Sequence, residues 1–129
     1  MNREKEFIAW DNISKQMFDV YSIEFRSDGI WVCLDWVSKV TGFRENWLSQ
    51  DRMEIMQYTG LKDKNNKKVF KFDILKHQIE DKTYYSIIDW NDRLARFELR
   101  NLKENLLMPI TFVKEREIIG NKWENPELL

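Results

Sequence analysis

The stretch Thr83-Tyr84-Tyr85-Ser86-Ile87-Ile88-Asp89-Trp90 decides the fold class. It is rich in aromatic and β-branched side chains, which suit the pleated, half-buried surface of a β-strand. The polar residues Asn91-Asp92-Arg93 then turn the chain, and Leu94 to Leu99 alternate as the residues of a returning strand do. Together these segments predict a β-hairpin.

The same signals recur along the chain. Met17 to Phe25 predicts a strand with its odd-numbered residues on one face, and Ser27-Asp28-Gly29 turns it into a second strand at Ile30 to Leu34. Met53 to Tyr58 predicts another strand, and Asn65-Asn66 predicts a tight turn because asparagine tolerates the left-handed region. Further short strands are expected at Ile110 to Val113 and at Glu117 to Ile119. We therefore expect a mainly β protein whose antiparallel sheets include a small SH3-like barrel, closed or nearly closed.

One short helical or irregular segment is expected near residues 35–52. Trp36, Val40, Phe43 and Trp47 recur at spacings of four, three and four residues, which is the periodicity of a helix. Gly42 lies inside this pattern and weakens a helix by about 1 kcal/mol relative to alanine. The aromatic stripe fits either packing in the core or an exposed interaction face.

Length and composition fit a single domain. A chain of 129 residues buries enough surface to fold without a disulfide or a metal, and Cys33 is its one cysteine, so no intrachain disulfide is possible. We expect one domain over residues 1–129. Residues 1–52 would form an N-terminal hairpin region, residues 53–123 the barrel-like core, and residues 124–129 a C-terminal tail.

Three blocks of sequence carry a family resemblance. The first is Phe7-Ile8-Ala9-Trp10-Asp11 followed by Met17-Phe18. The second and most specific runs from Ile55 through Asn65 and on to Asp73-Ile74, and the third joins Ile119-Gly120-Asn121 to Glu124-Asn125-Pro126-Glu127-Leu128-Leu129. In order and spacing, nearly the whole chain resembles the YopX family.

The resemblance implies a small protein of phages and prophages, mainly of Gram-positive bacteria. It also implies a β-barrel-like fold and homo-oligomeric assembly, and it brings no enzymatic activity with it. The chain departs from the family pattern at three places. Ile8 replaces a basic residue, Asn65-Asn66 replaces Asn-Gly, and Phe72 stands where a glycine commonly precedes the Asp-Ile pair. The last departure puts a tight backbone path at Phe72 in question.

Few residues suit catalysis or metal binding. Cys33 and His77 are the only cysteine and histidine, on separate predicted strands, whereas nucleophilic catalysis and zinc sites need several partnered groups. We therefore expect no enzyme, no catalytic residue, no metal and no cofactor. Cys33 fits a buried small hydrophobe or a reactive thiol, and His77 a partly exposed residue at a strand end.

Carboxylates offer two weaker possibilities. The pairs Asp89 with Asp92 and Glu115 with Glu117 fit solvated surface charges or the acid pairs of a glycosidase or nuclease. Asp63 opens a segment that resembles the start of a calcium loop, but Lys67 stands where an oxygen ligand belongs, so a turn is favoured.

Local positive charge is the strongest functional signal, although the formal net charge is −1. Basic side chains beside aromatic ones can hold phosphates while bases stack, and a small barrel is a common platform for this. The same lysines also serve as ordinary protection of strand edges. The candidate nucleic-acid contacts are Lys62, Lys64, Lys67, Lys68, Lys71, Tyr84 and Arg96.

The C-terminal tail offers a different kind of contact. Trp123, Leu128 and Leu129 are apolar at a chain end, so they pack either on their own core or on a neighbouring subunit of a homo-oligomer. The favoured function is a phage accessory protein that self-assembles and binds a host or phage protein. The alternative is a nucleic-acid-binding module. The charged start of the chain and the absence of roughly 20 consecutive apolar residues favour the bacterial cytoplasm, with no membrane contact.

Overall fold

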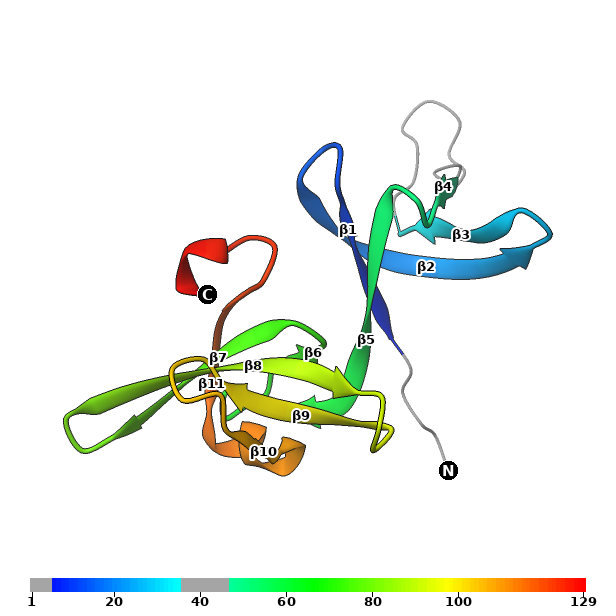
Figure 1. Ribbon diagram of the computed structural model, residues 1–129. Helices are drawn as coiled ribbons and strands as arrows, with labels where there is room; N and C mark the ends of the chain where they lie inside the picture. The colour runs from blue at the N-terminus through cyan, green and yellow to red at the C-terminus, as the bar shows by residue number, and fades with distance from the viewer. Residues whose placement is uncertain (1–5, 36–46) are drawn as a thin grey trace. The chain divides into compact units, whose positions relative to one another are not determined.

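The computed structural model describes residues 6–35 and 47–129, which form antiparallel β-structure with two short 3-10 helices (Figure 1). The chain divides into two compact units: an N-terminal unit, Glu6–Gln57, and a C-terminal unit that includes Tyr58–Leu129. Strand β5 (Met53–Lys62) runs through the boundary, so its first half belongs to one unit and its second half to the other. The prediction of a mainly β, antiparallel fold is confirmed.

The N-terminal unit is a sheet in the order β4-β3-β2-β1-β5, in which every neighbouring pair is antiparallel. Its remaining strands are β1 (Phe7–Asp11), β2 (Gln16–Arg26), β3 (Gly29–Leu34) and β4 (Trp47–Ser49). Buried Ala9, Val32, Leu34 and Met53 form its core, and burial of each larger side chain contributes about 2 kcal/mol. The predicted hairpin around Gly29 is confirmed, and Gly29 has φ +130, which favours glycine.

Two expectations for the N-terminal unit need correction. The register of β2 on β3 shifts between Val20 and Ser22, so the odd-numbered residues of β2 do not share one face. Trp47–Ser49, in the segment expected to be helical, form strand β4, because their backbone pairs with Trp31–Cys33. The helical stripe also included Trp36, Val40 and Phe43, which lie outside the described residues.

The C-terminal unit contains a five-stranded antiparallel sheet in the order β10-β9-β8-β7-β11. The strands are β7 (Asp73–Ile79), β8 (Lys82–Asn91), β9 (Arg96–Asn101), β10 (Leu107–Pro109) and β11 (Glu117–Asn121). A short strand β6 (Lys68–Phe70) pairs with the second half of β5. Within the described residues β10 and β11 are the two ends of this sheet, so the expected barrel is not closed. In Figure 1 the β7–β8 hairpin projects beyond the other strands of this unit.

One face of the five-stranded sheet carries the core. The register places Leu75 opposite Ser86 and Ile118, and Leu99 opposite both Ile88 and Met108. Directly opposed residues point to the same face, so this face is apolar in its middle. The fully buried residues of this cluster are Val69, Leu75, Ile88, Leu99 and Val113.

The β5–β6 turn is built around the carboxylate of Asp63, which is only 5% exposed. Its Oδ1 accepts the backbone N–H groups of Asn65 and Lys67, and its Oδ2 accepts that of Ile118, all at 2.9–3.0 Å. Asn66 has φ +66, which confirms the tight turn predicted there. The carboxylate holds the turn together, and its oxygens already accept backbone donors.

Phe72 keeps the tight backbone path that its replacement of glycine put in question. Its φ is +70, in the left-handed region that favours glycine. Its N–H donates to the carbonyl of Ile88 and its own carbonyl accepts the N–H of Lys122, so two other segments of the chain fix the strained residue. Its ring meets the ring of Trp123 edge-on, with centroids 5.9 Å apart.

The two short helices complete the C-terminal unit. Residues expected to form a strand at Ile110 to Val113 lie instead in the 3-10 helix η1 (Ile110–Glu115), where no neighbouring strand pairs with them and the N–H of Arg116 closes the last turn on the carbonyl of Val113. The second helix, η2 (Pro126–Leu128), lies in the tail. The strand expected at Glu117 to Ile119 is confirmed as part of β11.

Candidate functional site

A small pocket lies where the core face of the five-stranded sheet becomes polar. Leu75 and Ser86 belong to the core, and two residues further along the same face the paired residues are His77 and Tyr84. The pocket has a volume of about 180 Å³. We call it the Arg116 pocket; its lining residues are His77, Ile79, Tyr84, Asn101, Glu104, Leu106, Met108 and Arg116.

Arg116 is the residue that makes this pocket unusual. It directly follows η1, its carbonyl accepts the N–H of Lys64 at 2.9 Å, and its side chain is buried, with only 6% of the residue exposed. Its Nη1 donates to the hydroxyl of Ser86 at 3.0 Å, and its Nη2 lies 3.4 Å from the sulfur of Met108. Its Nε has no hydrogen-bond partner among the described residues.

The guanidinium of Arg116 is therefore buried with only a hydroxyl and a sulfur as hydrogen-bond acceptors. Among the described residues no carboxylate forms an ion pair with it. Burial lowers the pKa of the guanidinium from its ordinary value, and the charge of Glu115 opposes that shift. A buried charge without a paired carboxylate is costly, so its retention calls for an explanation.

The loop beside the pocket is held in a fixed conformation. The Oδ1 of Asn101 accepts the backbone N–H groups of Lys103 and Glu104, at 2.9 and 3.0 Å. The backbone of Asn101 also donates to Leu106, and that of Leu102 to Tyr85. Glu104 itself is exposed, so its carboxylate lies at the rim. The pocket wall is thus preformed.

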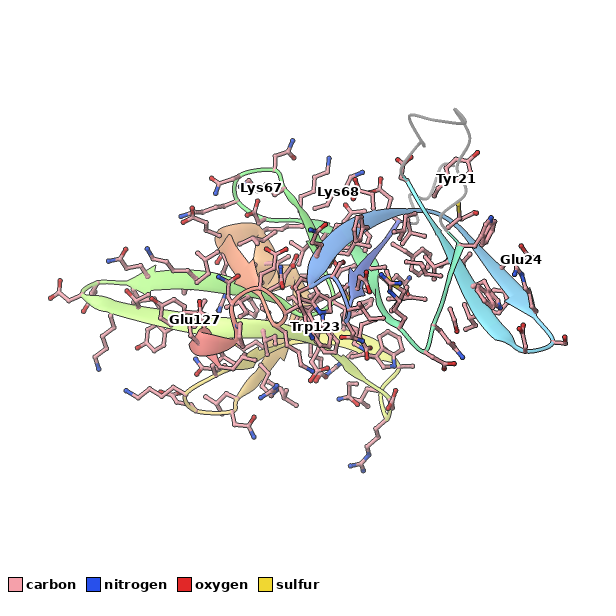
Figure 2. The ribbon with its side chains drawn as sticks, turned by 90° about the horizontal axis from the view of Figure 1, so that it is seen from above. Tyr21, Glu24, Lys67, Lys68, Trp123 and Glu127 are labelled. Atoms are coloured by element: carbon pink, nitrogen blue, oxygen red, sulfur yellow. The ribbon has the colours of Figure 1, made fainter. Side chains whose placement is uncertain are left out.

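The lysines predicted to bind nucleic acid lie close together in sequence and in space. Lys62 ends β5 and faces Lys68 of β6 across the hairpin, with Lys64 and Lys67 in the turn and Lys71 just after β6. Figure 2 shows Lys67 and Lys68 on this hairpin. The ammonium of Lys68 lies 5.6 Å from the ring centroid of Tyr58, and that of Lys71 lies 4.6 Å from that of Phe72.

The other two predicted nucleic-acid contacts lie apart from each other. Tyr84 pairs with His77 near one end of β8, whereas Arg96 pairs with Asn91 at the other end, roughly 20 Å or more away at about 3.3 Å per residue. Tyr84 lines the Arg116 pocket, and the Nε of Arg96 donates to Glu98 at 2.8 Å. The hairpin lysines, Tyr84 and Arg96 therefore do not form one surface.

A second surface contains Trp90 at the opposite end of the β8–β9 hairpin from Tyr84. Trp90 is 39% exposed and meets Phe97 edge-on, with ring centroids 4.9 Å apart, and Leu107 is 58% exposed on β10. Both line a depression of about 370 Å³, which we call the Trp90 surface. The register turns the ring of Trp90 to the face that carries Ile88, and Leu107 to the opposite face with Arg100. Its other residues are Asp89, Asn91, Asp92, Arg93, Glu98 and Arg100.

The tail residues divide between contact and exposure. Trp123 is half-buried and packs on Phe72, whereas Leu129 is 56% exposed (Figure 2 places Trp123). Leu128 and Leu129 line a pocket of about 540 Å³ beside the start of β8. Trp123 packs on its own unit through its contact with Phe72.

The remaining candidate groups are buried or form surface contacts. Cys33 is 1% exposed, which confirms the buried small hydrophobe, and His77 is half-buried on β7. Asp89 lies 3.8 Å from Arg100 as a surface ion pair. Within residues 6–35 and 47–129, no three His, Cys, Asp or Glu side chains gather to hold a metal ion, and no helix has the length and apolar character to cross a bilayer.

Comparison with known proteins assigns the family. The family model described as YopX protein matches residues 6–129 of the chain. The chain belongs to the YopX family. This confirms the resemblance carried by the three sequence blocks. No curated protein matches the sequence of this YopX-family protein.

Two solved structures resemble this YopX-family protein over almost its whole length. Protein EF1440 from Enterococcus faecalis is 27% identical, with a TM-score of 0.70, and the match covers 99% of each chain. Protein yopX from Bacillus subtilis is 18% identical, with a TM-score of 0.64, and the match covers 96% of this chain and 97% of that one. The second likeness supports the fold alone.

Sequence reasoning missed Arg116 in this YopX-family protein. Arg116 stands in the charged run Lys114-Glu115-Arg116-Glu117, which reads as a solvated surface segment. The burial arises because η1 brings this run against the open end of the core face, next to Ser86 and Met108. No periodicity or motif in the sequence signals that contact.

Proposed function

We propose that this YopX-family protein is a non-enzymatic phage or prophage accessory protein that self-assembles and binds a host or phage protein in the bacterial cytoplasm. The Trp90 surface is the observation that carries the proposal. Arginine is among the residues most enriched at binding hot spots, and this surface presents Arg93 and Arg100 at its edge. Leu107 adds exposed apolar area next to them.

The strand edges favour contact through a face over contact through an edge. At one end of the five-stranded sheet, β10 has three residues and contains Pro109, which has no N–H to donate. At the other end, the register of β11 shifts between Ile118 and Gly120. Both features discourage pairing with a foreign strand, whereas the Trp90 surface is open.

The non-enzymatic part of the proposal is supported by how three of the four buried carboxylates among the described residues are used. Asp63 accepts three backbone N–H groups, and Asp11 accepts the guanidinium of Arg52. Glu98 accepts Arg96 and Asn91, which together hold its pKa below the ordinary value. Carboxylates fixed in this way serve structure and are poorly placed to exchange protons with a substrate.

Sedimentation velocity over a range of protein concentrations tests self-assembly. Leu107→Glu should shift the protein toward the monomer, because a carboxylate in the contact must be desolvated. Ile13→Glu is the matched control, since Ile13 is 71% exposed in the β1–β2 turn of the N-terminal unit. Equal assembly of the wild type and Leu107→Glu would remove the Trp90 surface from the proposal.

Partner binding needs a separate measurement. Tagged wild type is used to capture proteins from host lysate, with and without nuclease treatment, beside Arg100→Ala and Ile13→Glu. A protein retained after nuclease treatment, lost with Arg100→Ala and kept with Ile13→Glu, is the expected result. A partner lost on nuclease treatment would instead favour the second candidate function.

Nucleic-acid binding is the second candidate function. The observation that favours it is the grouping of Lys62, Lys64, Lys67, Lys68 and Lys71 on one hairpin. The adjoining ring of Tyr58 is only 6% exposed and lies under Lys68, so it offers little area for stacking bases. Binding would therefore rest on phosphate contacts more than on stacking.

A further inference from the structure

We propose that the Arg116 pocket binds a carboxylate group carried on a short apolar chain. The pocket combines a buried guanidinium whose Nε has no partner among the described residues with an apolar wall of Ile79, Leu106 and Met108. The Trp90 surface lies at the other end of the β8–β9 hairpin, so this inference stands apart from the proposed protein contact.

The vacant edge of the guanidinium has the geometry of a carboxylate fork. The Nη1 of Arg116 is engaged by Ser86, which leaves Nε and Nη2 as the two donors of one edge, with only the weak sulfur acceptor of Met108 beside Nη2. Two parallel N–H groups on one edge match the two oxygens of a carboxylate. A methionine side chain is flexible and can move aside.

The same chain uses this geometry elsewhere. In the N-terminal unit, the Nε and Nη2 of Arg52 donate to the two carboxylate oxygens of Asp11, at 2.6 and 2.5 Å. Arg116 has the same pair of atoms, more deeply buried and without an aspartate, and movement of Met108 would open this edge to the pocket that Arg116 and Met108 line. The missing element in the C-terminal unit is thus one carboxylate.

The size of the pocket limits the ligand. Pockets for drug-sized ligands measure roughly 300–1,000 Å³, and the share of liquid volume of one water is about 30 Å³. At about 180 Å³ the Arg116 pocket holds the equivalent of only a few waters, so it suits a carboxylate with a few carbon atoms. The apolar wall favours a chain over a hydrated inorganic ion.

Charge also favours a carboxylate over phosphate. Among the described residues that line the pocket, Arg116 is the only lysine or arginine. The rim carries the carboxylate of Glu104. A single positive charge matches a single negative one, whereas a phosphate dianion would remain half uncompensated near Glu104. His77, Tyr84 and Asn101 face the same space and can add hydrogen bonds to the ligand.

The carboxylate can come from a free small molecule or from a glutamate side chain of a protein. Both present the same group and the same short chain, so the pocket chemistry is shared. Butyrate represents the first source, and a blocked peptide with one internal glutamate represents the second. Inorganic phosphate and the corresponding glutamine peptide are the negative probes.

Nuclear magnetic resonance of the arginine Nε–H groups gives a direct test on the full chain. Butyrate or the glutamate peptide should shift the Arg116 Nε–H signal saturably and leave that of Arg100 in place. Whichever of the two binds more tightly identifies the source. Binding by phosphate as tight as by both carboxylates, or an Arg116 signal that none of the probes moves, overturns the proposal.

Variants separate a specific fork from general positive charge. Arg116→Lys keeps the charge but loses the fork, and should weaken butyrate binding by about tenfold, the equivalent of one charged hydrogen bond. Arg100→Lys is the control and should bind as the wild type does. Glu104→Gln, an exposed change that spares the fold, should bind more tightly. Weaker binding by Glu104→Gln would contradict the binding of an anionic carboxylate beside Glu104.

Discussion

The carboxylate of Asp11, at the end of β1, accepts two hydrogen bonds from the guanidinium of Arg52, which lies 41 residues later in the turn before β5. The same carboxylate accepts the N–H of Ile13 and the hydroxyl of Ser14. Asp11 therefore ties the β1–β2 turn to the turn between β4 and β5. A residue that is only 1% exposed joins two loops of the N-terminal unit.

Asp11→Ala should destabilise the N-terminal unit. The hydrogen bonds to Arg52, Ser14 and Ile13 hold the pKa of Asp11 well below its ordinary value of 3.8, against the opposing effect of burial. Loss of the carboxylate leaves donors without an acceptor, which costs about 1–3 kcal/mol in free energy of unfolding. Urea unfolding at neutral pH measures the loss, and an unchanged midpoint would count against this role.

The same carboxylate predicts acid sensitivity. Because the pKa of Asp11 is lower in the folded state, its contribution is complete at neutral pH and declines as the pH falls below about 4. The stability difference between wild type and Asp11→Ala should therefore shrink in acid. Ser14→Ala, which keeps the carboxylate, should retain the acid dependence and serves as the control.

Asp73 predicts the opposite pH dependence in the C-terminal unit. Burial raises its pKa to about 7, the N–H of Phe70 opposes this, and the charges of Asp63 and Glu124 add to it. The folded state then holds a proton that the unfolded state releases near pH 4. The contribution of protonated Asp73 to the free energy of unfolding is complete below about pH 4 and is lost as the pH rises to about 7.

Asp73→Asn isolates that effect. The asparagine keeps an oxygen for the N–H of Phe70 but carries no charge. The variant should be more stable than the wild type at pH 8, with the advantage disappearing near pH 4. Urea unfolding at both pH values measures it, and Asp89→Asn, a change at a partly exposed surface ion pair, is the control. A constant difference at both pH values would contradict the raised pKa.

Local signals in the sequence explain why the hairpins were predictable. The β8–β9 hairpin, the turn at Gly29 and the turn at Asn66 each depend on residues near one another in the chain. Longer-range pairing was less accessible. The bulge in β2 and the pairing of Trp47 with Cys33 are set by partner strands. The spacing of apolar residues alone therefore put the odd-numbered residues of β2 on one face, and predicted a helix where Trp47 lies in a strand.

The candidate sites show the same limit. The lysines were predicted as a group because they are neighbours in sequence, and they share one hairpin. Tyr84 and Arg96 were predicted because aromatic and basic residues alternate along the later hairpin, but the strand direction puts these two at opposite ends of β8–β9. Arg116 meets Ser86 from 30 residues away, a contact that the tertiary fold creates and no local pattern announces.

Phe72 gives a prediction that reverses the usual order of glycine and alanine. At its φ of +70 an alanine is strained and a glycine is not, so Phe72→Gly should be more stable than Phe72→Ala by about 1 kcal/mol. Both variants lose the contact with Trp123 and the nearby ammonium groups of Lys71 and Lys122, so that loss cancels in the comparison.

Thr83 provides the control for that comparison, since it is an exposed residue inside β8. There Thr83→Gly should be less stable than Thr83→Ala, because glycine loses more freedom in an ordinary strand. Urea unfolding of the four variants measures both differences. The same order at both positions would show that the backbone of Phe72 is not strained in solution.

The lysine hairpin is tested by reversing its charge. If Lys64, Lys67 and Lys68 contact phosphates, changing all three to glutamate should abolish binding to single-stranded oligonucleotides. For the wild type, affinity should fall steeply with salt, and each phosphate contact contributes about 0.7 to the slope of log K against log salt. Fluorescence anisotropy with a labelled oligonucleotide measures both quantities.

A matched triple variant separates a local site from net charge. Lys82, Lys103 and Lys114 are exposed in the same unit but lie outside the β5–β6 hairpin. Their change to glutamate alters the net charge by the same amount and should leave most of the binding intact. Equal loss in both triple variants would mean that nucleic acid senses only total charge. Retained binding in the hairpin variant would remove the second candidate function and leave protein contact through the Trp90 surface.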